Sequence, residues 1–117
     1  KKSLCIMNSL GFENLKKRSD FLSIRKTNIS FYSKFLIINL KSNKFTESFR
    51  LGLTVSKKQG GAVERNYIKR VLRAIFVKNC SNVPKNFDYE IIPKKNFNEC
   101  TFSSLEEDLL KILRKID

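Results

Sequence analysis

The sequence contains no histidine, and this absence excludes much of the chemistry by which proteins break bonds on their own. Without histidine, no Ser-His or Cys-His pair can activate a nucleophile, and the commonest general base is missing. The cysteines, Cys5, Cys80 and Cys100, are odd in number and far apart. They match neither a zinc motif nor a complete disulfide framework. We therefore expect reduced thiols, no protein-held metal and no catalytic residues in this chain.

Long apolar segments are also missing. The longest apolar runs cover only four residues, as at residues 35–38, and the apolar stretch that follows Lys1 and Lys2 is interrupted at Asn8. A membrane span needs about 20 apolar residues, and the core of a signal peptide needs about 7 to 15. We therefore predict a soluble, cytoplasmic protein with no membrane partner.

Acidic residues are scarce, because 11 Asp and Glu stand against 24 Lys and Arg, for a formal net charge of +13. Such a charge implies a polyanionic partner, with nucleic acid as the first candidate and an anionic membrane as the second. A chain of 117 residues, 41% of them hydrophobic, has material for one modest core. We expect a single RNA-binding domain over residues 1–117 with no obligate protein partner, in which residues 1–18 form a basic, irregular N-terminal arm.

The strongest local pattern spans residues 50–78. Leu51, Leu53 and Val55 alternate with small or polar residues, which predicts a half-buried strand. The Gln-Gly-Gly sequence at residues 59–61 predicts a turn that takes positive φ. From Ala62 onward the apolar residues recur at helical spacing, which predicts a helix with one aliphatic face. Those residues are Ile68, Val71, Leu72, Ile75 and Phe76.

The same predicted helix carries cations beside its aliphatic face. Arg65, Lys69 and Arg73 are spaced at i, i+4 and i+8, with Asn66 and Arg70 beside them. Like charges at this spacing repel by about 0.2 to 0.5 kcal/mol per pair, which a polyanion would more than offset. A merely solvated helix face is disfavoured, because Glu64 is the only acid near these cations. Together with two preceding lysines they form what we call the cationic ridge: Lys57, Lys58, Arg65, Asn66, Lys69, Arg70 and Arg73.

Weaker patterns predict two further helices. Ser19 or Asp20 caps a short helix that ends near Lys26. Its inward-facing residues are Phe21, Leu22 and Ile24. The Ser-Ser-Leu-Glu sequence at residues 103–106 matches a capping box at the start of a C-terminal amphipathic helix. We assign the acidic residues of this helix a structural role, because capping explains them.

Two stretches predict the remaining strands. Residues 29–41 are rich in β-branched and aromatic side chains, which predicts one long strand or two short strands broken near Ser33. Residues 87–92 alternate apolar and acidic types, which predicts a last strand with Asp88 and Glu90 facing outward. Lys94 and Lys95 then extend the basic surface. The element order α-β-β-β-α-β-α fits one sheet with helices packed on it, an α+β architecture.

Residues 52–73, GLTVSKKQGGAVERNYIKRVLR, resemble the signature of the protein subunit of bacterial ribonuclease P. The hallmark of that family is a basic helix reading Arg-Asn-Arg after a strand that ends in Lys-Lys. Here it reads Arg65-Asn66-Tyr67, with Tyr67 in place of the second arginine. The resemblance implies an α/β sandwich with one mostly antiparallel sheet and an unusual left-handed βαβ crossover, whereas periodicity alone favours a right-handed connection.

The resemblance also implies a function. Ribonuclease P removes the 5′ leader of precursor tRNA in tRNA maturation, and in bacteria its catalytic part is RNA. This chain would then be an accessory subunit of a ribonucleoprotein endoribonuclease, with the catalytic RNA and precursor tRNA as partners. Mg²⁺, which phosphodiester hydrolysis implies, would be held mainly by RNA oxygens.

The resemblance further assigns roles to individual residues. It implies that the cationic ridge binds the catalytic RNA and that Phe21 stacks on a leader base, although Phe21 could instead be a simple core residue. The family has an aromatic residue near Ile38 that helps to line the leader groove, and this chain lacks it. Phe31 or Tyr32 could replace it, and we take Tyr32 as the candidate.

Two other functions fit parts of the sequence. A ribosomal or other structured-RNA-binding protein without a catalytic partner would have the same charge and aromatic content. A stand-alone nuclease would use Asp88 and Glu90 as bases, with lysines as electrophiles. The ordered motif at residues 50–73 argues against the first function, and the absence of histidine argues against the second.

Overall fold

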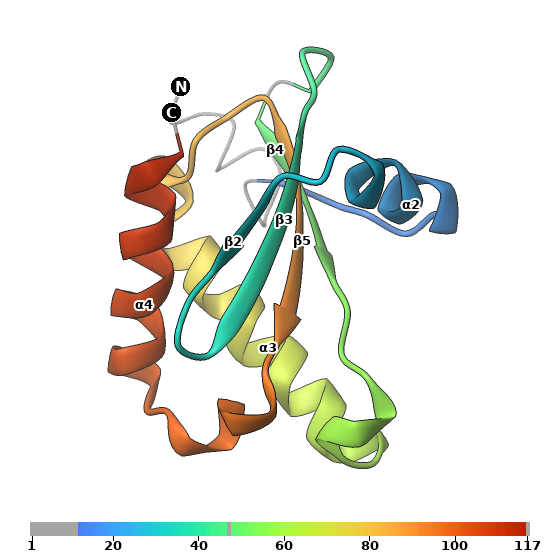
Figure 1. Cartoon of the computed structure of the whole chain (residues 1–117). Coiled ribbons are helices and arrows are strands. Elements are labelled where there is room, and N and C mark those ends of the chain that lie inside the picture. The colour runs from blue at the N-terminus through green and yellow to red at the C-terminus, as the bar shows by residue number, and fades with distance from the viewer. Residues whose placement is uncertain (1–11, 47, 117) are drawn as a thin grey trace.

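The computed structural model describes residues 12–46 and 48–116, so Cys5 and most of the predicted N-terminal arm lie outside the described residues. It contains three α-helices and three 3₁₀ helices: α2 (Arg18–Lys26), α3 (Ala62–Lys78), α4 (Phe102–Lys115), η1 (Lys57–Gln59), η2 (Cys80–Asn82) and η3 (Lys95–Glu99) (Figure 1). Its strands are β1 (Glu13–Asn14), β2 (Ser30–Tyr32), β3 (Leu36–Ser42), β4 (Phe49–Leu53) and β5 (Phe87–Pro93). The predicted element order is therefore confirmed for the described part of the chain, with the short β1 added before it.

The strands form one sheet in the order β1-β4-β5-β3-β2. β4 is parallel to both β1 and β5, whereas β3 is antiparallel to β5 and β2. The sheet is thus mixed: the predicted βαβ crossover implies the parallel pair β4–β5, whereas the parallel pair β1–β4 was not predicted. Helix α3 carries the chain back to the end of the sheet at which β4 began, so β5 runs parallel to β4. The left hand of this βαβ crossover stays a prediction.

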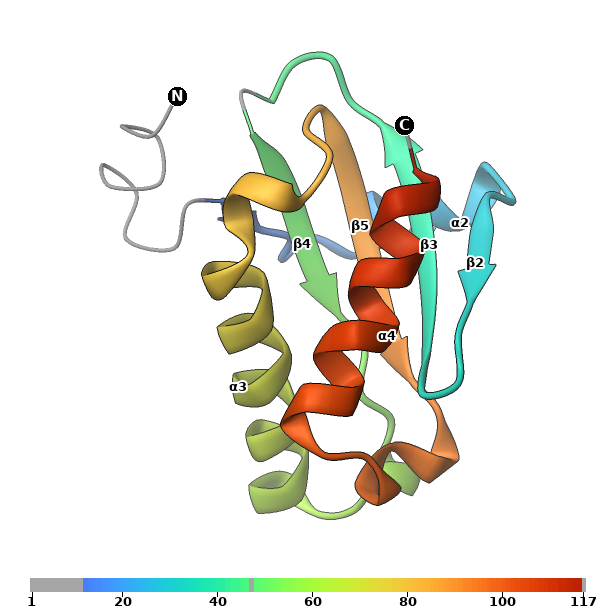
Figure 2. The same cartoon turned by 90° about the vertical axis from the view of Figure 1, so that its left-hand side faces the viewer.

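Helices α3 and α4 cover one face of the sheet, and α2 lies on the other face (Figures 1 and 2). The core lies between the sheet and helices α3 and α4. Phe12, Phe49 and Phe76 pack together there, and the Phe12 and Phe49 rings stack at a centroid distance of 4.9 Å. Phe12 belongs to the segment that we expected to be irregular, but it is buried and β1 follows it, whereas residues 15–17 form neither helix nor strand.

The two strand predictions for residues 29–41 and 87–92 have different outcomes. The first stretch forms β2 and β3, which are separated at residues 33–35, so the two-strand alternative is confirmed. In β5, Asp88 and Glu90 do lie on the face away from the main core, but they are 2% and 0% exposed rather than outward. α2 lies over this face and places Arg25 against Glu90, while Arg50 of the neighbouring strand β4 pairs with Asp88.

The predicted helix caps were also wrong. α2 begins at Arg18 with no side-chain cap, and Leu22 on that helix is exposed. α4 begins at Phe102, because the Thr101 hydroxyl accepts from the Ser104 amide at 3.1 Å and the Ser104 hydroxyl accepts from the Thr101 amide at 3.0 Å. This reciprocal pair places the cap at Thr101, two residues ahead of the predicted cap at Ser103.

The acidic residues of α4 are structural, but for a different reason from capping. The Glu106 carboxylate accepts hydrogen bonds from Asn79 at 2.7 Å and from Lys78 at 3.2 Å, which ties α4 to the end of α3. The Asp108 carboxylate accepts from the Phe35 amide at 3.2 Å, which ties α4 to the turn between β2 and β3.

Candidate nucleic-acid interface

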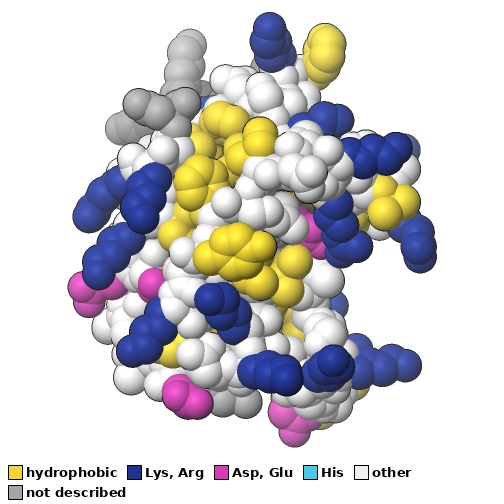
Figure 3. Space-filling model, in the orientation of Figure 1, with side chains coloured by type: hydrophobic (Ala, Val, Ile, Leu, Met, Phe, Trp, Pro, Cys, Tyr) yellow, Lys and Arg dark blue, Asp and Glu magenta, His cyan; other side chains and the backbone are white. Residues whose placement is uncertain are grey.

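A cleft of about 470 Å³ separates α2 from α3 above the end of β4. Four cations line it: Lys16, Arg18, Arg25 and Lys69. Its other lining residues are Phe21, Leu22, Leu53, Thr54 and Val55. No acidic side chain is among these described lining residues, and Figure 3 shows the hollow with Lys and Arg side chains on both sides of it. We call this site the cleft.

Phe21 takes its place in the cleft because residue 52 is a glycine. A Cβ atom at Gly52 would lie only 2.4 Å from Cε1 and 2.5 Å from Cζ of the Phe21 ring. The ring therefore rests directly on the backbone of β4, which no side-chain-bearing residue would allow without a shift. Phe21 is half-buried, with one side on the strand and the other bordering the cleft. The structure thus brings Phe21 and Lys69 of the ridge to one site.

Arg25 stands one turn after Phe21 on α2 and is held by a buried carboxylate. Its Nε donates to Glu90 Oε1 at 3.1 Å, and its Nη2 donates to Glu90 Oε2 at 2.6 Å. Burial alone would raise the pKa of Glu90, but the hydrogen bonds from its three side-chain partners outweigh burial and hold that pKa below its ordinary value. The hydrogen bond to this carboxylate raises the pKa of Arg25. Both groups are therefore charged at neutral pH.

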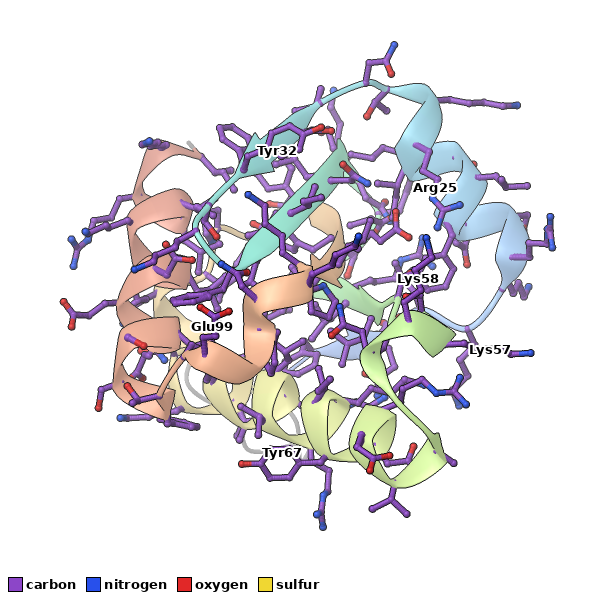
Figure 4. All side chains as sticks on the ribbon, turned by 60° about the horizontal axis from the view of Figure 1, so that its bottom comes forward. Arg25, Tyr32, Lys57, Lys58, Tyr67 and Glu99 are labelled. Atoms are coloured by element: carbon purple, nitrogen blue, oxygen red, sulfur yellow. The ribbon has the colours of Figure 1, made fainter. Side chains whose placement is uncertain are left out.

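A second hollow lies at the ends of β4 and β5, and its lining includes Ser56, the residue after Val55 of the cleft. Its four lysines are Lys34, Lys58, Lys94 and Lys95, and no acidic side chain is among the described residues that line it. The Gln59 amide fixes this arrangement by donating to the carbonyls of Pro93 at 3.0 Å and Lys94 at 3.1 Å. We call this site the lysine hollow. In Figure 4, Arg25 and Lys58 approach the space between α2 and η1 from opposite sides.

The loop before α3 has the positive-φ turn that the sequence predicted. Gly60 has a φ of 136°, a conformation that L side chains rarely adopt, so a glycine is required there. The Glu64 carboxylate accepts from the Gly61 amide at 2.9 Å, which satisfies one free amide at the start of α3. This turn holds Lys57 and Lys58 just ahead of the helix.

The cationic ridge on α3 divides into two sides. Lys69 borders the cleft, and Arg65 and Arg73 are half-buried one turn on either side of it. Asn66 and Arg70 are exposed and lie about 60° and 100° further around the helix from Lys69. Tyr67 lies further round still, and Figure 4 shows it pointing away from Lys58. One helix therefore presents cations to the cleft and to the outer surface.

The two aromatic candidates of β2 lie on opposite faces of the sheet. Phe31 is opposite Ile38 in the register and packs against the core. Tyr32 is opposite Ile37, on the face that carries Glu90 and α2, and it is 68% exposed. The Lys94 ammonium lies 5.8 Å from its ring centroid. Tyr32 thus lies on the same face of the sheet as the cleft but does not line it, so the structure does not bring Tyr32 together with Phe21.

The described residues do not form a metal site. Among them, no three His, Cys, Asp or Glu side chains come close enough to bind one ion. Asp88 is committed to Arg50 through two hydrogen bonds of 2.8 Å, as Glu90 is committed to Arg25. These buried, paired carboxylates cannot act as bases on a substrate. The structure therefore argues against the hypothesis of a stand-alone nuclease that uses Asp88 and Glu90. Within the described ranges, no helix is both long enough and apolar enough to cross a membrane.

Sequence reasoning missed part of the groove lining. Lys16 and Arg18 were predicted only as part of a basic arm, and neither Arg25 nor Lys34 was predicted to bind RNA. Arg25 could have been found from its spacing, because residues 21 and 25 on one helix lie on the same face. The Lys94-Lys95 pair follows directly after β5, and the Lys57-Lys58 pair follows β4 after residues 54–56. Because β4 and β5 are parallel neighbours, both pairs meet at one edge of the sheet.

Comparison with known proteins gives one consistent family. The model for "Ribonuclease P" matches residues 11–117. A ribonuclease P protein component of Thermotoga petrophila is 38% identical over 109 residues, which cover 90% of this chain and 92% of that protein. That of Finegoldia magna is 40% identical over 102 residues, covering 86% and 88% of the two chains.

Solved structures agree with this result. The ribonuclease P protein from Thermotoga maritima is 36% identical and superposes with a TM-score of 0.81, covering 90% of this chain and 98% of that chain. The Staphylococcus aureus protein is 33% identical with a TM-score of 0.77, covering 88% and 93%. The chain therefore belongs to the ribonuclease P protein family, the protein component of the ribonucleoprotein endoribonuclease that matures the 5′ end of tRNA.

Proposed function

We propose that the cleft and the lysine hollow bind the single-stranded 5′ leader of precursor tRNA, while the outer side of the cationic ridge binds the RNA subunit. The observation that carries this proposal is the lining of the cleft, where four cations surround a half-buried aromatic ring without an acidic neighbour among the described lining residues. A charged groove that contains a stacking surface is the usual way to bind single strands without sequence preference.

The charges of the cleft and the lysine hollow suit an RNA sugar-phosphate backbone that passes both sites. The cleft and the lysine hollow contribute four cations each and meet near Val55 and Ser56. A single strand laid through both would place phosphates beside cations along its whole bound length. Each neutralised phosphate releases counterions, so this binding weakens as the salt concentration rises.

Aromatic side chains supply the second component of leader binding. A base stacked on the open side of the Phe21 ring would gain about 1 to 3 kcal/mol, whatever its sequence. Tyr32 offers a second ring on the same face of the sheet, beside Lys94 of the lysine hollow. We assign Phe21 the main stacking role, because its half-buried ring lines the cleft and Tyr32 does not.

The outer side of the ridge is free to contact a second RNA surface at the same time. Asn66 and Arg70 are exposed on this outer side, and the half-buried Arg65 and Arg73 flank Lys69 along the helix, where they can reach either RNA. With Lys57 at the preceding turn, these side chains suit the phosphates of a folded RNA. The protein would thus bridge the RNA subunit and the leader, with Lys58 and Lys69 on the leader side.

The chain would contribute binding and orientation, and the RNA subunit would carry out hydrolysis. Mg²⁺ supplies charge stabilisation for phosphodiester cleavage, and RNA oxygens suit it better than the described residues, whose buried carboxylates are paired with arginines. We derive no catalytic step from a protein side chain.

Reconstitution tests this proposal. Leader removal is measured at low Mg²⁺ with the RNA subunit alone and with the protein added, using precursor tRNA with and without most of its leader. We expect the protein to increase cleavage, and to increase it more when the leader is long enough to reach the cleft. An equal effect on both substrates would contradict leader binding. Enrichment of ribosomal RNA rather than one catalytic RNA in a lysate pull-down would favour the structured-RNA alternative.

The role of the outer ridge is tested with a matched pair of arginine variants. Arg70→Ala on α3 should weaken binding to the RNA subunit by about 1.5 to 3 kcal/mol, the usual value of a hydrogen bond to a charged group. It should also reduce the slope of log affinity against log salt by about 0.7 to 0.9. Arg114→Ala on α4, which changes an equally exposed arginine, should leave both values unchanged. Equal effects of the two variants would remove the ridge from the interface.

A further inference from the structure

The centre of the sheet face under α2 contains a fully buried carboxylate. Glu90 is 0% exposed and accepts four hydrogen bonds, two of them from Arg25. The Thr54 hydroxyl donates to Oε2 at 2.6 Å, and the Asn39 amide donates to Oε1 at 3.1 Å. Burying an ion pair costs several kcal/mol per ion, roughly as much as the pair returns, so stability alone gives little reason to keep one.

The consequence of this network is a fixed guanidinium in the cleft. The carboxylate is held by side chains from β3 and β4, and the Arg25 side chain is held by the carboxylate, although 48% of that side chain is exposed. Two of the five guanidinium N–H groups are directed at Glu90. The Nη1 edge has no hydrogen-bond partner among the described residues, and Arg25 lines the cleft.

A second ion pair in the same sheet provides an internal comparison. Arg50 donates two hydrogen bonds of 2.8 Å to Asp88, which is also buried. Arg50 lies in addition 3.6 Å from Asp20 and does not line the cleft. Its charge is therefore shared between two acids and stays within the fold. Arg25 has one acid as its partner and faces three further cations, so the cleft keeps a strong positive potential.

We propose that Arg25 is a preoriented phosphate-binding residue of the cleft, with Glu90 as its positioning residue. This inference rests on the proposed function of the cleft in leader binding. The two outer N–H groups of a guanidinium match two oxygens of a phosphate, a geometry that a lysine cannot reproduce. Because Glu90 already fixes the side chain, little conformational entropy is lost when the phosphate binds.

The position of Arg25 also predicts which phosphate it holds. Phe21 and Arg25 are at i and i+4 on α2, about 6 Å apart along one helix face. A nucleotide whose base stacks on Phe21 therefore has its own or the adjacent phosphate within reach of Arg25. The leader would be held at one defined nucleotide rather than by diffuse attraction along the groove.

The test uses the enzyme reconstituted with its RNA subunit. The quantity measured is the ratio of Kd for tRNA without a leader to Kd for precursor tRNA, at constant salt. We expect Arg25→Gln to lower this ratio about 10- to 100-fold, the loss of a charged hydrogen-bonded pair. Arg25→Lys retains the charge but not the two-pronged geometry, and should lower the ratio several-fold. Arg50→Lys, the matched control in the second ion pair, should leave it unchanged.

The positioning role of Glu90 is tested by asking whether the effect of Glu90→Gln depends on the presence of Arg25. Glu90→Gln should lower the same ratio several-fold, and should lower it no further when Arg25 is already glutamine. A purely structural role predicts equal effects of Glu90→Gln in both backgrounds. If Glu90→Gln fails to fold, Arg25→Lys still decides the question, because it retains a cation against the buried carboxylate. Thermal unfolding of each variant identifies loss of the fold.

A neutral methylphosphonate introduced at single leader positions locates the contact. At the nucleotide held by Arg25, the wild type and Arg25→Gln should bind the modified precursor equally well. If they differ by the same factor at every modified position, Arg25 does not hold a phosphate and the inference is overturned. If Arg25→Gln leaves the ratio unchanged while Phe21→Ala lowers it, the inference fails and the proposed function stands. If neither variant lowers the ratio, the proposed function itself fails.

Discussion

The contact between Phe21 and Gly52 gives the most direct test of the cleft. Gly52→Ala would place a Cβ atom 2.4 Å from Cε1 and 2.5 Å from Cζ of the Phe21 ring. Carbon atoms normally stay about 3.5 to 4.0 Å apart, so the ring must move by at least about 1 Å. The strand lies below the ring and the cleft is open beside it, so we expect the ring to move into the cleft.

Two free energies follow from this displacement. Overpacking costs about 1 to 3 kcal/mol of stability, which a folded domain tolerates when the displaced ring borders open space. A displaced ring also loses its stacking geometry, worth about 1 to 3 kcal/mol per base. We therefore expect Gly52→Ala to weaken binding of precursor tRNA by about 5- to 150-fold while leaving tRNA without a leader unaffected.

The assay is equilibrium binding of labelled precursor tRNA and of tRNA without a leader to the reconstituted enzyme, combined with thermal unfolding of the protein. Gly61→Ala is the control, because a Cβ atom there meets only the flexible Glu64 carboxylate, at 3.1 Å. A Gly52→Ala protein that loses stability but binds the leader normally would show that Phe21 is a core residue. Normal stability and normal binding would refute the described contact altogether.

Two further predictions concern the stability of the fold. The pKa of Glu90 lies below its ordinary 4.5, so its ion pair stabilises the fold above that pH and loses this contribution as the pH falls. Urea unfolding should therefore show that the free energy of unfolding falls less on acidification in Glu90→Gln than in the wild type. Parallel pH profiles of the two proteins would contradict this. Thr101→Ala should lower the free energy of unfolding by about 0.5 to 2 kcal/mol through loss of the α4 cap, whereas Ser103→Ala should have little effect. A larger effect at Ser103 would restore the cap first predicted.

Patterns that depend on near neighbours in the sequence were predicted correctly. The switch from alternation to helical spacing at residues 51–62 predicted β4, the glycine turn and α3, because strand and helix periods are local properties. The same spacing predicted that Arg65, Lys69 and Arg73 would share one side of a helix. Acid-free stretches then predicted a polyanionic partner from charge alone.

Patterns that depend on distant segments were not predictable. The alternation in β5 correctly put Asp88 and Glu90 on the face away from the core, but it could not say that α2 covers that face. The two residues of β1 are too few to give a periodic signal, and they pair only because β4 offers a free edge. The start of α4 was misplaced because two overlapping capping patterns occur within residues 101–106, and local sequence does not choose between them.

Local sequence patterns predict the helices, every described strand except β1, the aliphatic and cationic sides of α3 and the family signature, because each depends on residues within a few positions of one another. Only the tertiary structure decided which residues form the groove. Its lining comes from α2, β4, η1, α3 and the end of β5, which are distant along the chain. Burial of the core brings these segments together, and burial is a property of the whole packed chain rather than of any local pattern.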